Sequence, residues 1–171
     1  KVNLDKSISK IKSRGIFKDV NYNIKDGGEN NLKIIDINVE EQSTGEISAG
    51  AGIGTSGGTI AFGIKENNFM GKGISLDSNF LVSGDSLKGK FGLTNPNYKN
   101  SDKSVYINAE IIETDNFKTF GYKSNKKGFN IGTKFEYLDD FNLGIGTSNF
   151  YEVIETNSTA SASQQSQEGN Y

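Results

Sequence analysis

The sequence predicts a mostly β chain: the first strands of an antiparallel transmembrane β-barrel, preceded by one helix and two strands. From Thr44 onward, apolar and polar residues alternate with a period of two, which places them on opposite faces of a strand. These runs exceed the roughly 5 or 6 residues typical of soluble strands and reach the roughly 9 to 11 that a tilted membrane strand needs. About seven such runs follow one another, which predicts an antiparallel sheet with short connections.

The two faces of these runs differ in charge. One face is apolar and is expected to carry no charge, whereas the other mixes glycine and small polar residues with charged ones. The charged positions are Glu46, Lys65, Asp77, Lys88, Lys90, Glu110, Lys134, Glu136 and Glu152. This pattern is typical of strands with one face in lipid and the other in a polar lumen. Bacterial barrels usually have an even number of strands, so we expect further strands downstream.

At the N-terminus the sequence predicts a helix packed on a β-hairpin. Leu4, Ile8 and Ile11 fall on one stripe of a helix. Two alternating runs follow, at 17–24 and 32–41, joined by a turn at 25–30. A helix and two strands are too small to form a stable domain, so this part is expected to be the end of a larger one.

Composition excludes several classes of function. The chain has a net charge of −2 and no cysteine or histidine. There is therefore no electrostatic case for nucleic-acid binding, and no histidine- or cysteine-based catalytic group can be assembled. We expect no enzyme activity, no cofactor and no metal. The start of the sequence has no apolar targeting segment, so we expect one upstream.

Two motifs suggest other chemistry, but their sequence context does not support it. The segment 52–57 fits the dinucleotide-binding pattern G-x-G-x-x-G, but a strand-like run follows it where that site needs a helix. Asp139 and Asp140 stand between two predicted strands, where a solvated turn is expected rather than a metal or acid pair.

The connections favour one orientation of the sheet. If the first strand rises from the periplasm, the turns after the second, fourth and sixth strands are periplasmic. Each carries aromatic residues that suit an interfacial girdle: Phe69, Tyr98, Tyr137 and Phe141. The segments 114–127 and 155–171 are polar and longer, and we expect them to be loops on the outer side.

Four segments, in order along the chain, resemble the outer-membrane assembly factor family BamA. The segment 67–73 resembles its turn "aromatic-Leu-Gly-x-Gly", and 91–98 resembles its strand end "Thr-Asn-Pro-Tyr". Upstream, 13–20 is similar to the helix-to-strand corner of its last POTRA domain, and 40–45 to the junction into the barrel. The matching turn residues are Asn68, Phe69, Gly71, Gly73, Asn95, Pro96 and Tyr98.

The resemblance implies a domain division and a function. Residues 1–43 would be the end of the last POTRA domain, in the periplasm, and 44–171 the first strands of the barrel, ending in an extracellular loop. The implied function is assembly and insertion of β-barrel proteins into the bacterial outer membrane. The implied partners are the outer-membrane lipid bilayer, unfolded β-barrel clients and accessory lipoproteins.

The first barrel strand is the candidate site. Glycines at 45, 50, 52 and 54 leave few side chains there to pack, and glycine weakens a strand interior. We hypothesise that a weak edge of this kind opens and adds a client strand by β-augmentation. The residues of this lateral-gate edge are Glu46, Ile47, Ser48, Ala49, Gly50, Ala51, Gly52, Ile53 and Gly54. The alternative interpretation is that these glycines relieve crowding or permit a bend.

Two other functions also fit the sequence. A transporter of the same superfamily, of the two-partner secretion or translocation-and-assembly type, would share the plan. A soluble or surface β-protein, such as an adhesin fragment, would show similar alternation.

Overall fold

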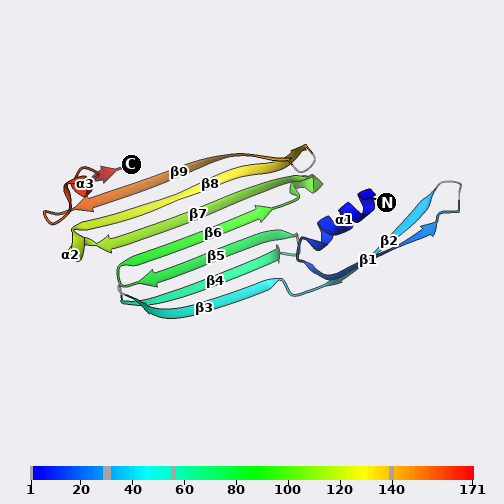
Figure 1. The fold of residues 1–171 in the computed structure, drawn as a ribbon, viewed down its shortest axis with the longest axis horizontal. Helices are drawn as coiled ribbons and strands as arrows, with labels where there is room; N and C mark the ends of the chain where they lie inside the picture. The colour runs from blue at the N-terminus through cyan, green and yellow to red at the C-terminus, as the bar shows by residue number, and fades with distance from the viewer. Residues whose placement is uncertain (1, 29–31, 55–56, 139–140) are drawn as a thin grey trace.

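The computed structural model describes the chain except for residues 1, 29–31, 55–56 and 139–140 (Figure 1). It contains a two-stranded sheet of order β1-β2 and an eight-stranded sheet of order β10-β9-β8-β7-β6-β5-β4-β3. Every strand pair is antiparallel. The predicted fold class, mostly β and antiparallel, is confirmed, and the large sheet is open rather than closed on itself.

The elements follow one another as a meander. The first three are α1 (Val2–Lys12), β1 (Phe17–Asp26) and β2 (Lys33–Glu41). The strands of the large sheet are β3 (Gly45–Gly54), β4 (Gly57–Phe69), β5 (Ile74–Ser83), β6 (Ser86–Asn95), β7 (Lys103–Asn116), β8 (Tyr122–Leu138), β9 (Phe141–Thr156) and β10 (Gly169–Asn170). Short helical turns are η1 (Tyr98–Asn100), α2 (Phe117–Phe120) and α3 (Ala162–Gln165).

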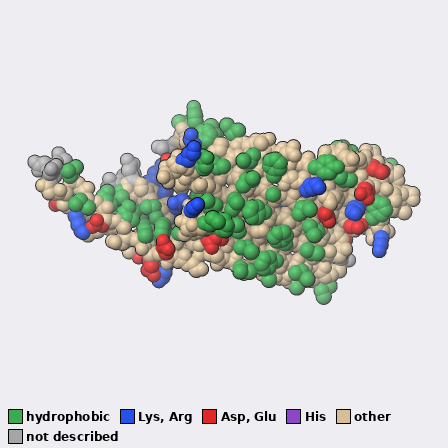
Figure 2. Space-filling model, turned by 180° about the vertical axis from the view of Figure 1, so that it is seen from behind, with side chains coloured by type: hydrophobic (Ala, Val, Ile, Leu, Met, Phe, Trp, Pro, Cys, Tyr) green, Lys and Arg blue, Asp and Glu red, His purple; other side chains and the backbone are tan. Residues whose placement is uncertain are grey.

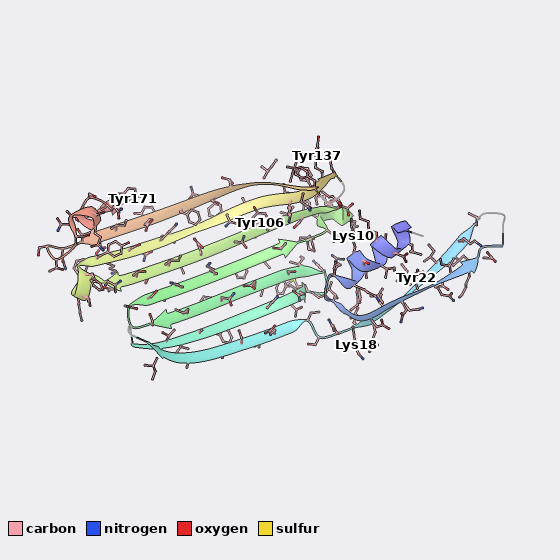
Figure 3. The ribbon with its side chains drawn as sticks, viewed as in Figure 1. Lys10, Lys18, Tyr22, Tyr106, Tyr137 and Tyr171 are labelled. Atoms are coloured by element: carbon pink, nitrogen blue, oxygen red, sulfur yellow. The ribbon has the colours of Figure 1, made fainter. Side chains whose placement is uncertain are left out.

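The predicted helix and hairpin form a small packed unit. Ile8 of α1, Ile16 just before β1 and Val20 of β1 are buried, and Val20 is 2% exposed. The Tyr22 hydroxyl donates a hydrogen bond to Asp5 of α1 at 2.9 Å (Figure 3). The predicted turn at 25–30 includes residues outside the described part of the chain. None of the described helices is both long and apolar enough to cross a membrane.

The large sheet has two distinct faces along most of its length. Ile47, Ile64 and Phe62 lie on the face that we call the apolar face, because cross-strand neighbours there are apolar too. On the opposite, polar face, Lys65 lies between Glu46 and Asp77 in neighbouring strands. Figure 2 shows hydrophobic side chains spread across the sheet, with charged ones gathered towards its ends. Within the described residues no element covers the apolar face, and Ile47 of β3 is 73% exposed.

The prediction of an outer loop at 114–127 is wrong. β7 continues to Asn116 and β8 begins at Tyr122, so that only α2 separates them. The backbone groups of polar residues pair between strands as well as those of apolar residues do. The hydrogen-bonded pairing of β7 with β8 therefore continues through this polar segment.

The same extension corrects a second expectation. Glu113 and Asp115 of β7 lie opposite Asn125 and Lys123 of β8, on the continuation of the apolar face. The Asn125 side chain donates a hydrogen bond to Glu113 at 2.6 Å. Contrary to the expectation, the apolar face therefore carries charge at this end of the sheet.

The predicted final loop, 155–171, is also partly structured. β9 runs to Thr156, and α3 follows with a capping box in which the Ser161 side chain accepts from the Gln164 backbone. The chain then returns to β9, where Glu152 and Tyr171 exchange backbone hydrogen bonds of 3.0 and 2.8 Å. This return forms β10, which pairs with β9 close to the C-terminal end of β9.

Candidate functional site

All nine predicted edge residues lie together on β3, which forms one edge of the large sheet. β3 pairs with β4 in an unbroken register from Gly45–Glu66 to Gly54–Gly57, and no described strand pairs with its other side. Every residue of β3 is exposed, and Ile53 is 96% exposed. The strand therefore offers a row of backbone donors and acceptors along one edge.

Three of the four glycines of β3 are not explained by crowding. A Cβ added at Gly50, Gly52 or Gly54 would meet no atom within 4 Å, whereas one at Gly45 would lie 3.0 Å from Glu66 Oε2. At the first three positions, the interpretation that glycine relieves crowding is not supported by the described neighbours. Their effect is to leave this part of β3 without side chains on the polar face that could hold it against β4.

Glycines elsewhere in the sheet have a different role. The Tyr106 side chain of β7 lies over Gly132 of β8 and Gly146 of β9 (Figure 3). A Cβ at Gly146 would lie 2.8 Å from the Tyr106 hydroxyl, and one at Gly132 would overlap the same group. Gly132 and Gly146 therefore make room for Tyr106, which is the opposite of the situation of Gly50, Gly52 and Gly54 in β3.

The polar face beside the edge carries alternating charge. A shallow hollow of about 250 Å³ is lined by Glu46, Ser48, Lys65, Asp77 and Asn79. The described residues contain no group of three or more histidine, cysteine or acidic side chains that could hold a metal ion. The hollow is an open, solvated surface beside β3.

The first predicted turn motif is held by its asparagine. The Asn68 side chain accepts a hydrogen bond of 2.7 Å from the Gly73 backbone, and the Asn68 carbonyl accepts one of 2.8 Å from Gly71. Met70, Gly71 and Gly73 all have positive φ, which explains glycine at the last two positions. The residue types in this motif are therefore those that the turn between β4 and β5 requires.

Glu66 links this turn to the start of β3 and was not singled out from the sequence. Its carboxylate accepts hydrogen bonds from the Thr44 hydroxyl and, at 2.7 Å, from the Asn68 backbone. Glu66 thus connects the start of the β3 edge to the predicted turn between β4 and β5. No periodicity or motif marks Glu66, because its partners belong to two other segments.

The second predicted turn, between β6 and β7, is built in a similar way. The Asn95 side chain accepts a hydrogen bond of 3.1 Å from the Asn97 backbone, and the Tyr98 carbonyl accepts one of 2.6 Å from the Ser101 hydroxyl. Lys99 has a positive φ of 53°, which is uncommon for a residue other than glycine. The turn thus presents Tyr98 and Lys99 side by side at its tip.

Helix α1 lies against these turns. Lys10 donates a hydrogen bond of 3.4 Å to Glu136 at the end of β8 and lies 3.9 Å from Asp102 in the turn before β7 (Figure 3). A hollow of about 320 Å³, lined in part by Ser13, Pro96 and Asn97, separates the helix from the turns. One helix therefore bridges two neighbouring turns of the large sheet.

The comparisons with known proteins bear on the fold. No protein-family model matches the chain, and no curated protein matches it. Among solved structures, it is similar to the crystal structure of BamA from Haemophilus ducreyi lacking POTRA domains 1–3, with a TM-score of 0.68 and 22% sequence identity. The match covers 90% of this chain and 30% of that structure. The chain therefore has a fold similar to part of a BamA structure.

Proposed function

We propose that this chain is part of a protein that assembles and inserts β-barrel proteins into the bacterial outer membrane. The observation that carries the proposal is the edge of β3, which is paired on one side and exposed along its whole length. The similarity of the fold to part of a BamA structure supports the same proposal. In this proposal β3 is a lateral-gate strand that templates the strands of clients.

The proposed mechanism is non-covalent. A client strand entering a membrane must satisfy its backbone donors and acceptors before it meets lipid, because each unpaired group costs several kcal/mol there. The β3 edge supplies those partners by β-augmentation. Gly50, Gly52 and Gly54 have no side chains to hold the edge in other pairings, so the edge opens at little cost. The mechanism needs neither a cofactor nor a metal.

The proposal includes a division of the chain between compartments. Residues 1–43 would be the end of a POTRA domain in the periplasm, and residues 44–171 the first strands of the barrel in the outer membrane. The buried side chains of Ile8 in α1 and Val20 in β1 support this division, as does the exposed apolar face of the large sheet. The partners would be the lipid bilayer, unfolded clients and accessory lipoproteins.

Site-specific photocrosslinking in cells tests the proposal. A photoreactive residue replaces Ser48 or Gly52 in β3, and the matched control replaces Asn108 in β7, a strand paired on both sides. We expect the β3 positions to capture the terminal strand of a tagged porin during its assembly, and the control to capture none. Equal capture from β3 and β7, or none from β3, would contradict the proposed edge.

A further inference from the structure

Two turns at the α1 end of the large sheet combine exposed apolar and basic side chains. We call them the turn patch: Met70, Lys72, Tyr98, Lys99 and Lys103. Met70 is 74% exposed and Tyr98 is 43% exposed, and all three lysines are exposed as well. We propose that the turn patch binds the headgroups of anionic phospholipids in the leaflet on the α1 side of the membrane. This proposal rests on the bilayer placement proposed above.

The turn after β4 holds its part of the patch in a fixed conformation. Met70 has a φ of 58°, a conformation that costs energy for a residue other than glycine. The hydrogen bonds from Gly71 and Gly73 to Asn68 maintain it. The turn therefore presents a long apolar side chain and Lys72 at its tip.

The turn after β6 places a ring and an ammonium group side by side. The Lys99 ammonium nitrogen lies 5.6 Å from the centroid of the Tyr98 ring. A tyrosine of this kind suits the boundary between acyl chains and headgroups, because its ring is apolar and its hydroxyl is polar. A lysine beside it reaches phosphate oxygens from the same depth while its stem stays against apolar groups.

Lys103 connects the turn patch to the apolar face. It lies opposite Phe135 of β8, in the same alternation as Val105 and Ile107. It is therefore a basic residue at the α1-end border of the surface that would face lipid. This is the position at which a cation meets headgroups rather than acyl chains.

Three described acidic groups near the turn patch have other partners. Asp102 and Glu136 both lie next to Lys10 of α1, at 3.9 and 3.4 Å. Glu66 accepts hydrogen bonds from Thr44 and Asn68. None of the three lysines of the turn patch forms an ion pair within the described part of the chain. Their charge is therefore available to an external anion.

The opposite end of the sheet lacks this excess of positive charge. There, Lys123 lies between Asp115 and Glu155 in neighbouring strands, and Glu113 is close by on the same face. Anionic lipid would gain no net attraction at that end. The predicted preference is thus confined to one leaflet.

Tryptophan fluorescence tests this proposal cleanly, because the chain contains no tryptophan. Two single reporters are made, Tyr98→Trp in the turn patch and Phe91→Trp in the middle of the apolar face. Each folded chain is reconstituted in bilayers of phosphatidylcholine and phosphatidylglycerol, and either lipid is brominated in turn. Brominated chains quench nearby tryptophan, so the ratio of quenching gives the relative binding of the two lipids.

We expect the Phe91→Trp reporter to be quenched equally by both lipids. The Tyr98→Trp reporter should favour phosphatidylglycerol by about fivefold or more, the effect of at least one lysine acting near a headgroup. The preference should weaken with added salt. Lys72→Gln, Lys99→Gln and Lys103→Gln together should abolish it, whereas Lys123→Gln with Lys127→Gln should leave it unchanged.

The outcomes separate the two proposals. Equal quenching of the Tyr98→Trp reporter by both lipids, with the Phe91→Trp reporter also quenched, would overturn lipid selection and leave the bilayer placement intact. A preference that survives the triple glutamine change would also overturn it. Absence of quenching at the Phe91→Trp reporter by either lipid would overturn the bilayer placement, and the proposed function with it.

Discussion

Lys10 and Glu136 lie 126 positions apart in the sequence, yet their side chains meet at 3.4 Å. Through this contact and the neighbouring approach to Asp102, the basic end of α1 joins the small N-terminal unit to the turns of the large sheet. Asp102 lies in the turn before β7 and Glu136 near the end of β8, so the docking of the helix depends on where these strands begin and end. The contact is exposed and electrostatic, which makes it sensitive to salt and to charge reversal.

Charge reversal at this contact should loosen the helix. We expect Lys10→Glu to shift α1 away from the turns, because two attractions of about 0 to 1 kcal/mol each become repulsions. Lys10→Glu with Glu136→Lys should restore part of the docking. The docking is measured as the distance between spin labels at Ser13→Cys, next to the end of α1, and Asn97→Cys, in the turn between β6 and β7. The chain has no other cysteine, so no other site is labelled.

A second charge change on the same helix serves as the control. Lys12 makes no ion pair within the described part of the chain, and Lys12→Glu should leave the distance distribution unchanged. Identical distributions for Lys10→Glu and the wild type would show that these ion pairs do not hold the helix.

Adding side chains to β3 should stiffen its edge. Gly50→Val and Gly52→Val place β-branched residues in open space, and each should gain roughly 0.5 to 1 kcal/mol of strand stability. Hydrogen exchange of β3 amides should slow by about two- to fivefold per change, and client assembly should slow with it. Unchanged exchange in both variants would contradict the weak-edge mechanism.

The opposite result is expected one strand away. A Cβ at Gly63 of β4 would lie 2.6 Å from the Ser48 hydroxyl and 2.8 Å from Asn79 Oδ1. Gly63→Val should therefore loosen the pairing of β3 with β4 and speed exchange. The pair of experiments separates an effect of valine itself from an effect of available space.

Tyr106 should make Gly146 intolerant of alanine. Gly146→Ala brings a methyl group within 2.8 Å of the Tyr106 hydroxyl, and such overpacking typically costs about 1 to 3 kcal/mol. Urea unfolding in detergent measures the loss. Adding Tyr106→Phe should recover part of it, since the crowded hydroxyl is removed.

A neighbouring glycine on the same strand provides the comparison. A Cβ at Gly144 would meet its nearest atom, the Thr133 carbonyl oxygen, at an ordinary 3.7 Å. Gly144→Ala should therefore change the free energy of unfolding far less than Gly146→Ala. Equal losses at both positions would show that alanine, rather than contact with Tyr106, is responsible.

The titration of Tyr22 should report the packing of α1. The hydrogen bond to Asp5 and its negative charge raise the pKa of the Tyr22 phenol above its ordinary value of 10.0. The resulting stabilisation is fully present below the unfolded pKa of about 10 and is lost as pH rises through the higher folded pKa. Carbon-13 chemical shifts of the tyrosine ring follow this titration.

Removing the carboxylate identifies the cause of the shift. Asp5→Asn deletes the charge and weakens the hydrogen bond, so the pKa of Tyr22 should fall back toward its ordinary value. A titration that is the same in both chains would mean that Tyr22 does not contact Asp5 in solution.

Local patterns were sufficient for the regular parts of this fold. Ile47 and Ile64 could be assigned to one face from alternation alone, because a strand buried or solvated on one side imposes a period of two. The sequence wrongly predicts a loop around Thr114, because the alternating residues there are mostly polar and do not mark an apolar face. The extension of β7 and β8 there depends on their mutual pairing, which neither segment reveals by itself.

The candidate site was predictable only in part. The edge residues of β3 follow from glycine content and from order along the chain. The contacts of Glu66 with Thr44 and of Lys10 with Glu136 join segments that carry no shared pattern, so tertiary structure alone reveals them.

The strict up-and-down order of the large sheet fixes its direction at both borders. Six successive antiparallel steps separate β3 from β9, so these two strands point the same way. A seam made directly between them would be parallel, whereas β10, which runs opposite to β9, has the polarity that an antiparallel neighbour of β3 requires. Any strand that joins β3 in an antiparallel ladder must therefore travel in the direction of β4, which sets the end from which it enters.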